Sequence, residues 1–150
     1  MFPSQHLLIG TVFVVLLYLA FPSIGIDGAI IILASTVLID IDHYIYYIYE
    51  KGNWNPLKAY HWFRIKHASW LRLSREERNK HRGIIFFLHG IETQIIWLLL
   101  GIFVHRYFLF VFIGFMFHLF LDLVYAKRFH DRLDKVSVIY DYFKFKKLNG

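Results

Sequence analysis

The chain has 150 residues, of which 57% are hydrophobic and 20% aromatic, and this composition excludes an ordinary water-soluble domain with one large core. The sequence contains no cysteine, which excludes disulfides, thiolate metal ligands and cysteine nucleophiles. The formal net charge of +6 is typical of basic loops that orient a membrane protein and meet anionic lipid headgroups, and we expect no nucleic-acid partner.

Four apolar segments of about 20 residues each follow one another, and each is about as long as a helix needs to cross a lipid bilayer. They comprise residues 5–20, 26–49, 84–104 and 107–125. Pro22 and Gly25 mark a short turn after the first segment, so the first two helices are expected to be antiparallel. Residues 84–125 would form a single helix about 63 Å long, twice the hydrocarbon thickness, and we therefore predict a turn near His105.

The polar segment between the second and third spans contains two signals for helix starts. Asn55 followed by Pro56 is typical of an N-cap and a first helical residue. Ser74 and Glu77 fit a capping box, so we expect the third helix to begin near Arg75 and to continue into the membrane. Between the two signals, aromatic residues are interleaved with lysine and arginine, which predicts an amphipathic helix in the headgroup layer.

The distribution of basic residues predicts the orientation. Residues 51–83 hold nine lysines and arginines and residues 127–150 hold seven, which leaves Arg106 alone on the other side. We therefore predict an all-α integral membrane bundle of four transmembrane helices in the cell membrane, with both termini and the interfacial helix cytoplasmic. Residues 1–126 are expected to form a transmembrane metal-site domain with an interfacial loop at 50–83, and residues 127–150 a basic cytoplasmic tail.

Charged and imidazole groups occur in all four predicted spans, and all of them fall in the cytoplasmic half apart from Asp27, which we interpret as a loop residue. Such groups are costly at membrane depth unless they are paired or hydrated, and they are functional candidates for that reason. Several are spaced by three or four residues, which places an imidazole and a carboxylate on one helix face in a chelating arrangement. The candidates are His6, Asp40, Asp42, His43, His89, Glu92, His118 and Asp122.

A set of histidine and carboxylate ligands without thiolate is typical of Zn²⁺, with Mn²⁺ or Fe²⁺ as alternatives, and the set is compatible with one ion or two. Taken singly, His43 is also explained as a hydrogen-bonded core residue, and His118 with Asp122 as a structural clasp between helices. The joint arrangement favours a metal or proton site. Asp42 lies about 160° around an ideal helix from Asp40, so it either supports the ligands or binds a second ion unless the helix distorts.

Four short motifs in order resemble the YdjM-like family of membrane-bound metal-dependent hydrolases. The residues that carry the resemblance are Gln5-His6-Leu7-Leu8, Leu38-Ile39-Asp40-Ile41-Asp42-His43, Lys80-His81-Arg82-Gly83 and Phe117-His118-Leu119-Phe120-Leu121-Asp122. The family has Leu-Pro where this chain has Leu38-Ile39, and its second histidine falls at the position of Phe86. If His89 takes the place of that histidine, Glu92 is expected to complete the ligand set.

The resemblance implies hydrolysis, with His6, Asp40, His43, His81, His118 and Asp122 as metal ligands and His89 as a further one. At headgroup depth the expected substrate is a phospholipid or another lipid ester, and Arg82 is suited to bind phosphate. Asp42, or else Glu92, would act as general base. The alternatives are a metal or proton transporter, for which the outer halves of the helices offer little polar lining, and a structural membrane subunit.

Overall fold

The computed structural model describes residues 3–80, 84–129 and 136–147. These residues fold into helices without any strand, which confirms the predicted all-α class. The elements are α1 (Pro3–Ala20), η1 (Pro22–Ile24), α2 (Gly25–Leu38), α3 (Ile41–Lys51), α4 (Pro56–Arg72), α5 (Arg75–Lys80), η2 (Phe87–His89), α6 (Ile91–Phe103), α7 (Tyr107–Phe129) and α8 (Val138–Lys147).

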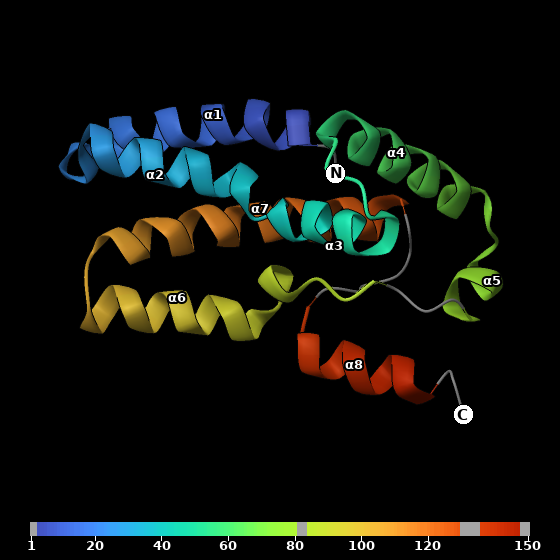
Figure 1. The fold of residues 1–150 in the computed structure, drawn as a ribbon. Coiled ribbons are helices and arrows are strands. Elements are labelled where there is room, and N and C mark those ends of the chain that lie inside the picture. Colours follow the sequence, from blue (N-terminus) through green and yellow to red (C-terminus); the bar gives the residue numbers. More distant parts are fainter. Residues whose placement is uncertain (1–2, 81–83, 130–135, 148–150) are drawn as a thin grey trace.

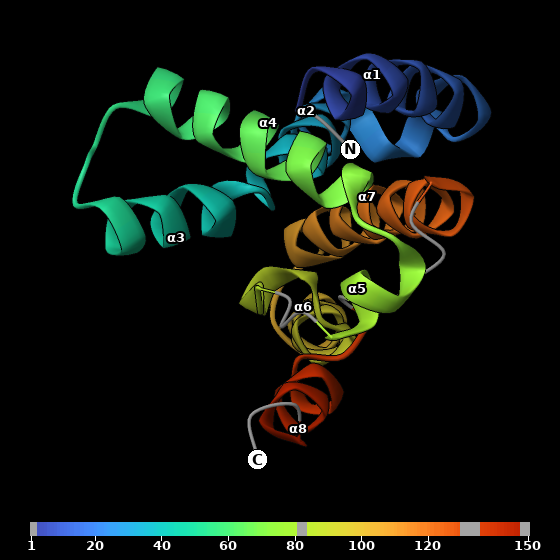
Figure 2. The same cartoon turned by 90° about the vertical axis from the view of Figure 1, so that its right-hand side faces the viewer.

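Four of the helices lie side by side as a bundle. Figure 1 shows them in the order α1, α2, α7 and α6, with α7 packed between α2 and α6. The remaining helices gather at one end of this bundle, where α1 begins. Figure 2 shows that α3 and α4 form a hairpin that projects away from the bundle at that end.

Three segments are long and apolar enough to cross a membrane, namely Pro3–Ala20, Pro22–Lys51 and Tyr107–Arg128. They agree with the first, second and fourth predicted spans, and they are compatible with a multi-pass membrane protein. Helix α6 is apolar but has only 13 residues, which corresponds to about 20 Å against a hydrocarbon core of about 30 Å.

The predicted capping box is confirmed, but the helix that it starts is short. Ser74 N donates to Glu77 Oε2 at 2.7 Å, and Glu77 N donates to Ser74 Oγ at 3.2 Å. Helix α5 then ends at Lys80, residues 84–86 are not helical, and α6 begins only at Ile91. The prediction of one helix from Arg75 into the membrane is therefore wrong.

The predicted start of α4 and two predicted turns are confirmed. The Asn55 side chain accepts hydrogen bonds from Leu57 N and Lys58 N, and Pro56 is the first residue of α4. The chain turns between α1 and α2 at Gly25, whose φ of 72° is a backbone conformation that favours glycine. The chain also turns between Phe103 and Tyr107, where a turn near His105 was predicted.

The second predicted span is interrupted where it approaches the candidate site. Helix α2 ends at Leu38 and α3 begins at Ile41, so Asp40 occupies a turn with φ −70° and ψ 0°. Ile39, in this turn, forms a small apolar core with Phe115 and Leu119, and Leu88 packs against this core. Each of Ile39, Leu119 and Leu88 is adjacent in sequence to a candidate ligand, so burial of the apolar residues fixes the neighbouring polar ones.

Close packing of α7 on α2 depends on Gly114. A Cβ atom at this position would lie 2.5 Å from the Ile32 carbonyl oxygen and 2.6 Å from Ser35 Cβ. Because any side chain would push the helices apart, glycine permits the approach that brings His118, one turn further along α7, to the backbone of α2.

Candidate metal centre

Six of the predicted ligands converge at the end of the bundle from which α3 projects. His6 comes from α1, Asp40 from the turn between α2 and α3, and His43 from α3, while the others come from η2 and α7. The side chains form two groups in which the potential ligand atoms lie within 4.8 Å of one another. The first group is Asp40, His43 and His89, and the second is His6, His118 and Asp122.

Asp40 is the centre of the first group. Its Oδ1 lies 3.4 Å from His43 Nδ1 and 3.5 Å from His89 Nε2. A third imidazole nitrogen, Nε2 of His118, lies 3.6 Å from the same oxygen and connects this group to the second. One carboxylate oxygen thus faces three imidazole nitrogens from α3, η2 and α7.

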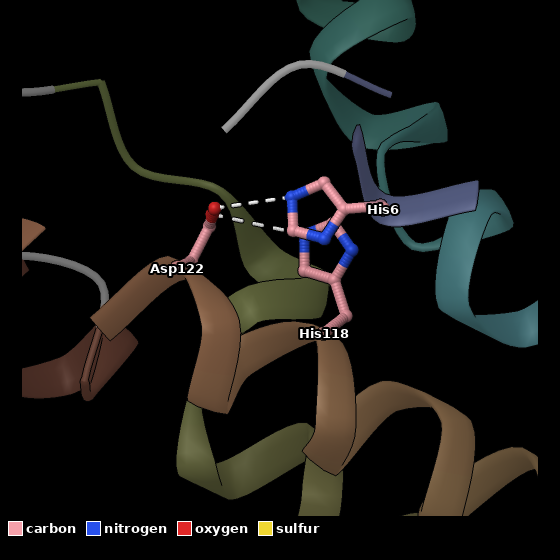
Figure 3. Close-up of side chains that lie close together, drawn as sticks. All are labelled: His6, His118 and Asp122. Carbon is pink, nitrogen blue, oxygen red and sulfur yellow. Dashed lines mark ion pairs between the residues drawn. The ribbon is translucent and has the colours of Figure 1, made fainter. Parts of the chain in front are cut away.

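The second group joins the start of α1 to the middle of α7. The rings of His6 and His118 stack face to face with centroids 3.7 Å apart, and the Asp122 carboxylate points at both rings (Figure 3). His6 Nε2 lies 3.2 Å from Asp122 Oδ1, and His118 Nε2 lies 3.7 Å from Asp122 Oδ2. Both histidines are completely buried. The spacing of four residues between His118 and Asp122 on α7 brings the two side chains together, as predicted.

These separations match the spacing between ligands of one ion. With bonds of about 2.0–2.1 Å, two ligands at tetrahedral angles are about 3.3–3.4 Å apart. Nitrogen and oxygen atoms that share a hydrogen bond lie closer, at about 2.7–3.2 Å. Most of the contacts around Asp40 and Asp122, from 3.4 to 3.7 Å, therefore suit a shared cation better than direct hydrogen bonds.

The orientation of His118 supports a cation site. Its Nδ1 lies 2.8 Å from the Thr36 carbonyl oxygen, and this contact requires a proton on Nδ1. In the neutral ring, Nε2 then presents a lone pair toward Asp40 and Asp122, and it makes no hydrogen bond within the described part of the chain. A lone pair that faces two carboxylates is unfavourable without a positive charge between them. A carbonyl on the opposite nitrogen is the usual support for a metal-binding histidine.

Asp42 supports the first group rather than joining it. Its Oδ2 accepts a hydrogen bond from Leu88 N at 3.1 Å and lies 3.0 Å from His89 Nδ1. Its Oδ1 lies 2.8 Å from His43 Nδ1. A carboxylate on Nδ1 of His89 leaves Nε2 of that ring directed at Asp40, as in the carboxylate–histidine pairs of metal sites. The break after Leu38 permits Asp40 and Asp42 to reach one cluster.

His43 is held between two partners. Its Nδ1 already contacts Asp42, so an ion that used this atom would have to replace that contact. The ring also stacks on Phe86, with centroids 3.6 Å apart, and meets the edge of Phe63. Phe86 therefore lines the cluster at the position where the resemblance implies a histidine, and His89 supplies the imidazole.

Glu92 lies elsewhere. Its carboxylate accepts hydrogen bonds from the Ser137 hydroxyl, from Val138 N at 3.0 Å and from Ile139 N at 3.2 Å. These contacts cap the first turn of α8 and fasten that helix to α6, since Ile91 N also donates to the Val136 carbonyl. The structure thus does not bring Glu92 to either ligand group. Helix α7 continues past residue 126, where the cytoplasmic tail is predicted to begin, as far as Phe129, and the division into domains stays a prediction.

We predict that Glu92→Ala loosens α8 without affecting metal binding. Loss of hydrogen bonds to a charged acceptor should cost about 1–3 kcal/mol locally, so the amide hydrogens of Val138 and Ile139 should exchange at least several-fold faster. Hydrogen exchange read by mass spectrometry measures this effect. Glu50→Ala, at an exposed position of α3, is the control. A lower metal content in Glu92→Ala would instead favour the predicted ligand or base role.

The remaining predicted site residues, His81 and Arg82, lie outside the described residues. Two contributions to the site were not predicted from the sequence. The Thr36 carbonyl is a backbone group, for which the sequence carries no signal. The stacking of Phe86 on His43 joins residues 43 positions apart and likewise has no local pattern.

We compared the chain with protein-family models, with curated proteins and with solved structures, and none of the three comparisons found a match. The resemblance to the YdjM-like family therefore stays a prediction from the motifs.

Proposed function

We propose that the chain is a membrane-embedded, metal-dependent hydrolase of the YdjM-like type that acts at the cytoplasmic leaflet of the cell membrane. In this proposal α1, the α2–α3 unit, α6 and α7 all cross the bilayer, and both termini are cytoplasmic. The residues before α6 would add to its short span, and α4 is proposed to lie as an amphipathic helix among anionic headgroups. The uneven distribution of basic residues supports this orientation.

The observation that carries the proposal is the environment of His118. A buried imidazole whose Nδ1 is occupied by a backbone carbonyl directs Nε2 at two carboxylates, at distances too long for hydrogen bonds and suited to a shared ion. If the cluster were only a structural clasp between helices, these atoms would instead lie at hydrogen-bond distance. The residues present therefore fit a divalent ion, and their nitrogen and oxygen atoms favour Zn²⁺, with Mn²⁺ as alternative.

Each residue of the cluster has a distinct task in this function. Asp40, His43, His89, His6, His118 and Asp122 would hold metal, while Asp42 and the Thr36 carbonyl fix the imidazole rings that face it. When bound, Zn²⁺ would lower the pKa of a coordinated water to about 7, and it would polarise the ester oxygen of the substrate. The expected substrate is a phospholipid or other lipid ester, and Arg82 is proposed to bind its phosphate.

The position of Asp42 changes the role proposed for it. Both oxygens are engaged, with Leu88 N and two imidazoles, and only 2% of the residue is exposed. A general base needs an oxygen that reaches water or substrate. We therefore propose that Asp42 is a positioning residue.

Metal content tests the proposal directly. Protein purified in detergent without chelators should contain Zn²⁺ or Mn²⁺, and His118→Ala should contain less and should lose metal-dependent hydrolysis of phospholipid vesicles. His105→Ala, outside the cluster in the turn before α7, is the control and should behave like the wild type. Absence of metal from the wild-type protein would contradict the proposal. Metal or proton flux into proteoliposomes without product would favour a transporter instead.

A further inference from the structure

The clustered side chains exceed what one zinc ion accepts. Zinc in proteins is usually four-coordinate, and catalytic sites use three protein ligands so that one position stays open. The structure divides the six side chains into two groups of three, Asp40 with His43 and His89, and His6 with His118 and Asp122. We infer that the centre binds two divalent ions, one in each group, and that its substrate is a phosphate ester. This inference rests on the proposed hydrolase function.

His118 belongs to the second group and also faces Asp40 of the first group. His118 Nε2 lies 3.7 Å from Asp122 Oδ2 in its own group and 3.6 Å from Asp40 Oδ1 in the other. The His118 ring also meets the edge of His89, with centroids 5.2 Å apart. Two ions in these groups would be close neighbours. Paired ions are the common solution in phosphatases and nucleases, where they hold both the attacking and the leaving oxygen, and they also occur in aminopeptidases.

The charge of the cluster with two ions bound suits an anionic substrate. Asp40, Asp42 and Asp122 bring three negative charges at membrane depth, and the imidazoles are neutral when they bind metal. One divalent ion would leave this set of side chains with a net negative charge, whereas two would leave a single positive charge. Because an uncompensated charge is costly there, a positive remainder favours an anionic substrate. A phosphate ester meets that requirement, and a neutral carboxylic ester does not.

Two lysines on the α3–α4 hairpin are further evidence for a phosphate ester as substrate. The ammonium groups of Lys66 and Lys51 lie 4.2 Å and 5.8 Å from the centroid of the Trp62 ring. Trp62 contacts Phe63, which meets the edge of His43. Two cations are thus placed a few rings away from the first group, where they would attract a phosphate-bearing headgroup.

The reaction implied is hydrolysis of one phosphorus–oxygen ester bond. The oxygen of water bonds to phosphorus as the bond to the alcohol oxygen breaks. One proton of the water ends on the departing alcohol, so that water is the only co-reactant.

Metal stoichiometry tests the number of ions. Elemental analysis of the full chain in detergent should find two ions in the wild type and one each in His6→Ala and His89→Ala, which lie in different groups. After reconstitution with Mn²⁺, electron paramagnetic resonance should show a spin-coupled pair in the wild type and an isolated ion in both variants. His61→Ala, exposed on α4, is the control. The wild-type measurements decide the question even if a variant fails to fold.

The outcomes separate this inference from the proposed function. One ion in the wild type, with an uncoupled spectrum, would overturn the two-ion inference and leave the hydrolase proposal standing. No ion would overturn both.

The substrate class needs a separate assay. Vesicles of phosphatidylcholine that contain phosphatidic acid or phosphatidylglycerol should be hydrolysed at the phosphate, as should soluble p-nitrophenyl phosphates if headgroup recognition is dispensable. Hydrolysis confined to vesicles would identify the lipid headgroup as the source of the phosphate. Lys66→Ala should raise KM for vesicles several-fold and leave the metal count at two. Turnover of p-nitrophenyl butyrate without any phosphate ester would overturn the assignment of substrate.

Discussion

Replacement of Asp40 by asparagine is expected to weaken metal binding by more than about 100-fold, and hydrolysis should fall with it. Outer-shell partners of metal ligands are worth about 10- to 100-fold in affinity, and Asp40 is proposed as a ligand in direct contact with the ion. Its Oδ1 faces three imidazole nitrogens at 3.4–3.6 Å. Asparagine has nearly the same shape, so the change removes charge and ligand strength while it preserves packing. Titration with Zn²⁺ or Mn²⁺ measures the affinity.

Thermal unfolding separates this role from a purely structural one. A ligand at 100 times its Kd stabilises the folded state by about 2.7 kcal/mol, so metal should raise the Tm of the wild type clearly more than that of Asp40→Asn, which retains only the second group intact. A clasp of hydrogen bonds would instead make Asp40→Asn less stable than the wild type with chelator present. Asp27→Asn, at an exposed position near the start of α2, makes the same chemical change away from the cluster and should respond to metal like the wild type.

Local signals in the sequence were sufficient for much of the fold. The caps at Asn55 and Ser74 and the turn at Gly25 were predicted correctly because each depends on residues within a few positions of one another. The long apolar segments that form α1 and α7 were also predicted from the sequence as membrane spans. In these places, local propensity and tertiary structure agree.

Two backbone breaks could not be predicted, and both are tied to the candidate centre. The turn at Asp40 interrupts a segment with neither glycine nor proline between Gly28 and Gly52. Residues 84–86 are apolar and suit a helix, yet they are not helical, and Leu88 N donates to Asp42 instead of to a helical carbonyl. Contacts between distant residues outweigh local preference at these positions, as is expected near functional sites.

The same breaks explain which side-chain pairs were predicted correctly. His118 and Asp122 lie within the continuous helix α7, so their spacing of four residues places both in one group. His89 and Glu92 have a helical spacing of three, but Gly90 between them is extended, with φ −81° and ψ 151°. His89 consequently points into the cluster, while Glu92 caps α8. Helical spacing identifies partners only where the helix is unbroken.

Replacement of Asp42 by asparagine is expected to lower the metal affinity by about 10- to 100-fold, with full metal content at saturating concentration. The variant keeps one acceptor oxygen, but it cannot accept hydrogen bonds from His43, His89 and Leu88 N together. Nε2 of His89 would then no longer be held toward Asp40, from which it lies 3.5 Å away. Because the ligands themselves are unchanged, excess metal should restore most of kcat.

This experiment distinguishes a positioning residue from a general base. A base that abstracts a proton contributes typically 10²- to 10⁴-fold to the rate, and its loss would lower kcat at saturating metal while the metal Kd stays that of the wild type. The structure favours the first result, because Asp42 is buried and both of its oxygens are engaged with protein groups. An unchanged metal affinity together with a lasting loss of kcat would return Asp42 to the role of base. Water would then reach the Asp42 carboxylate only after the cluster rearranges.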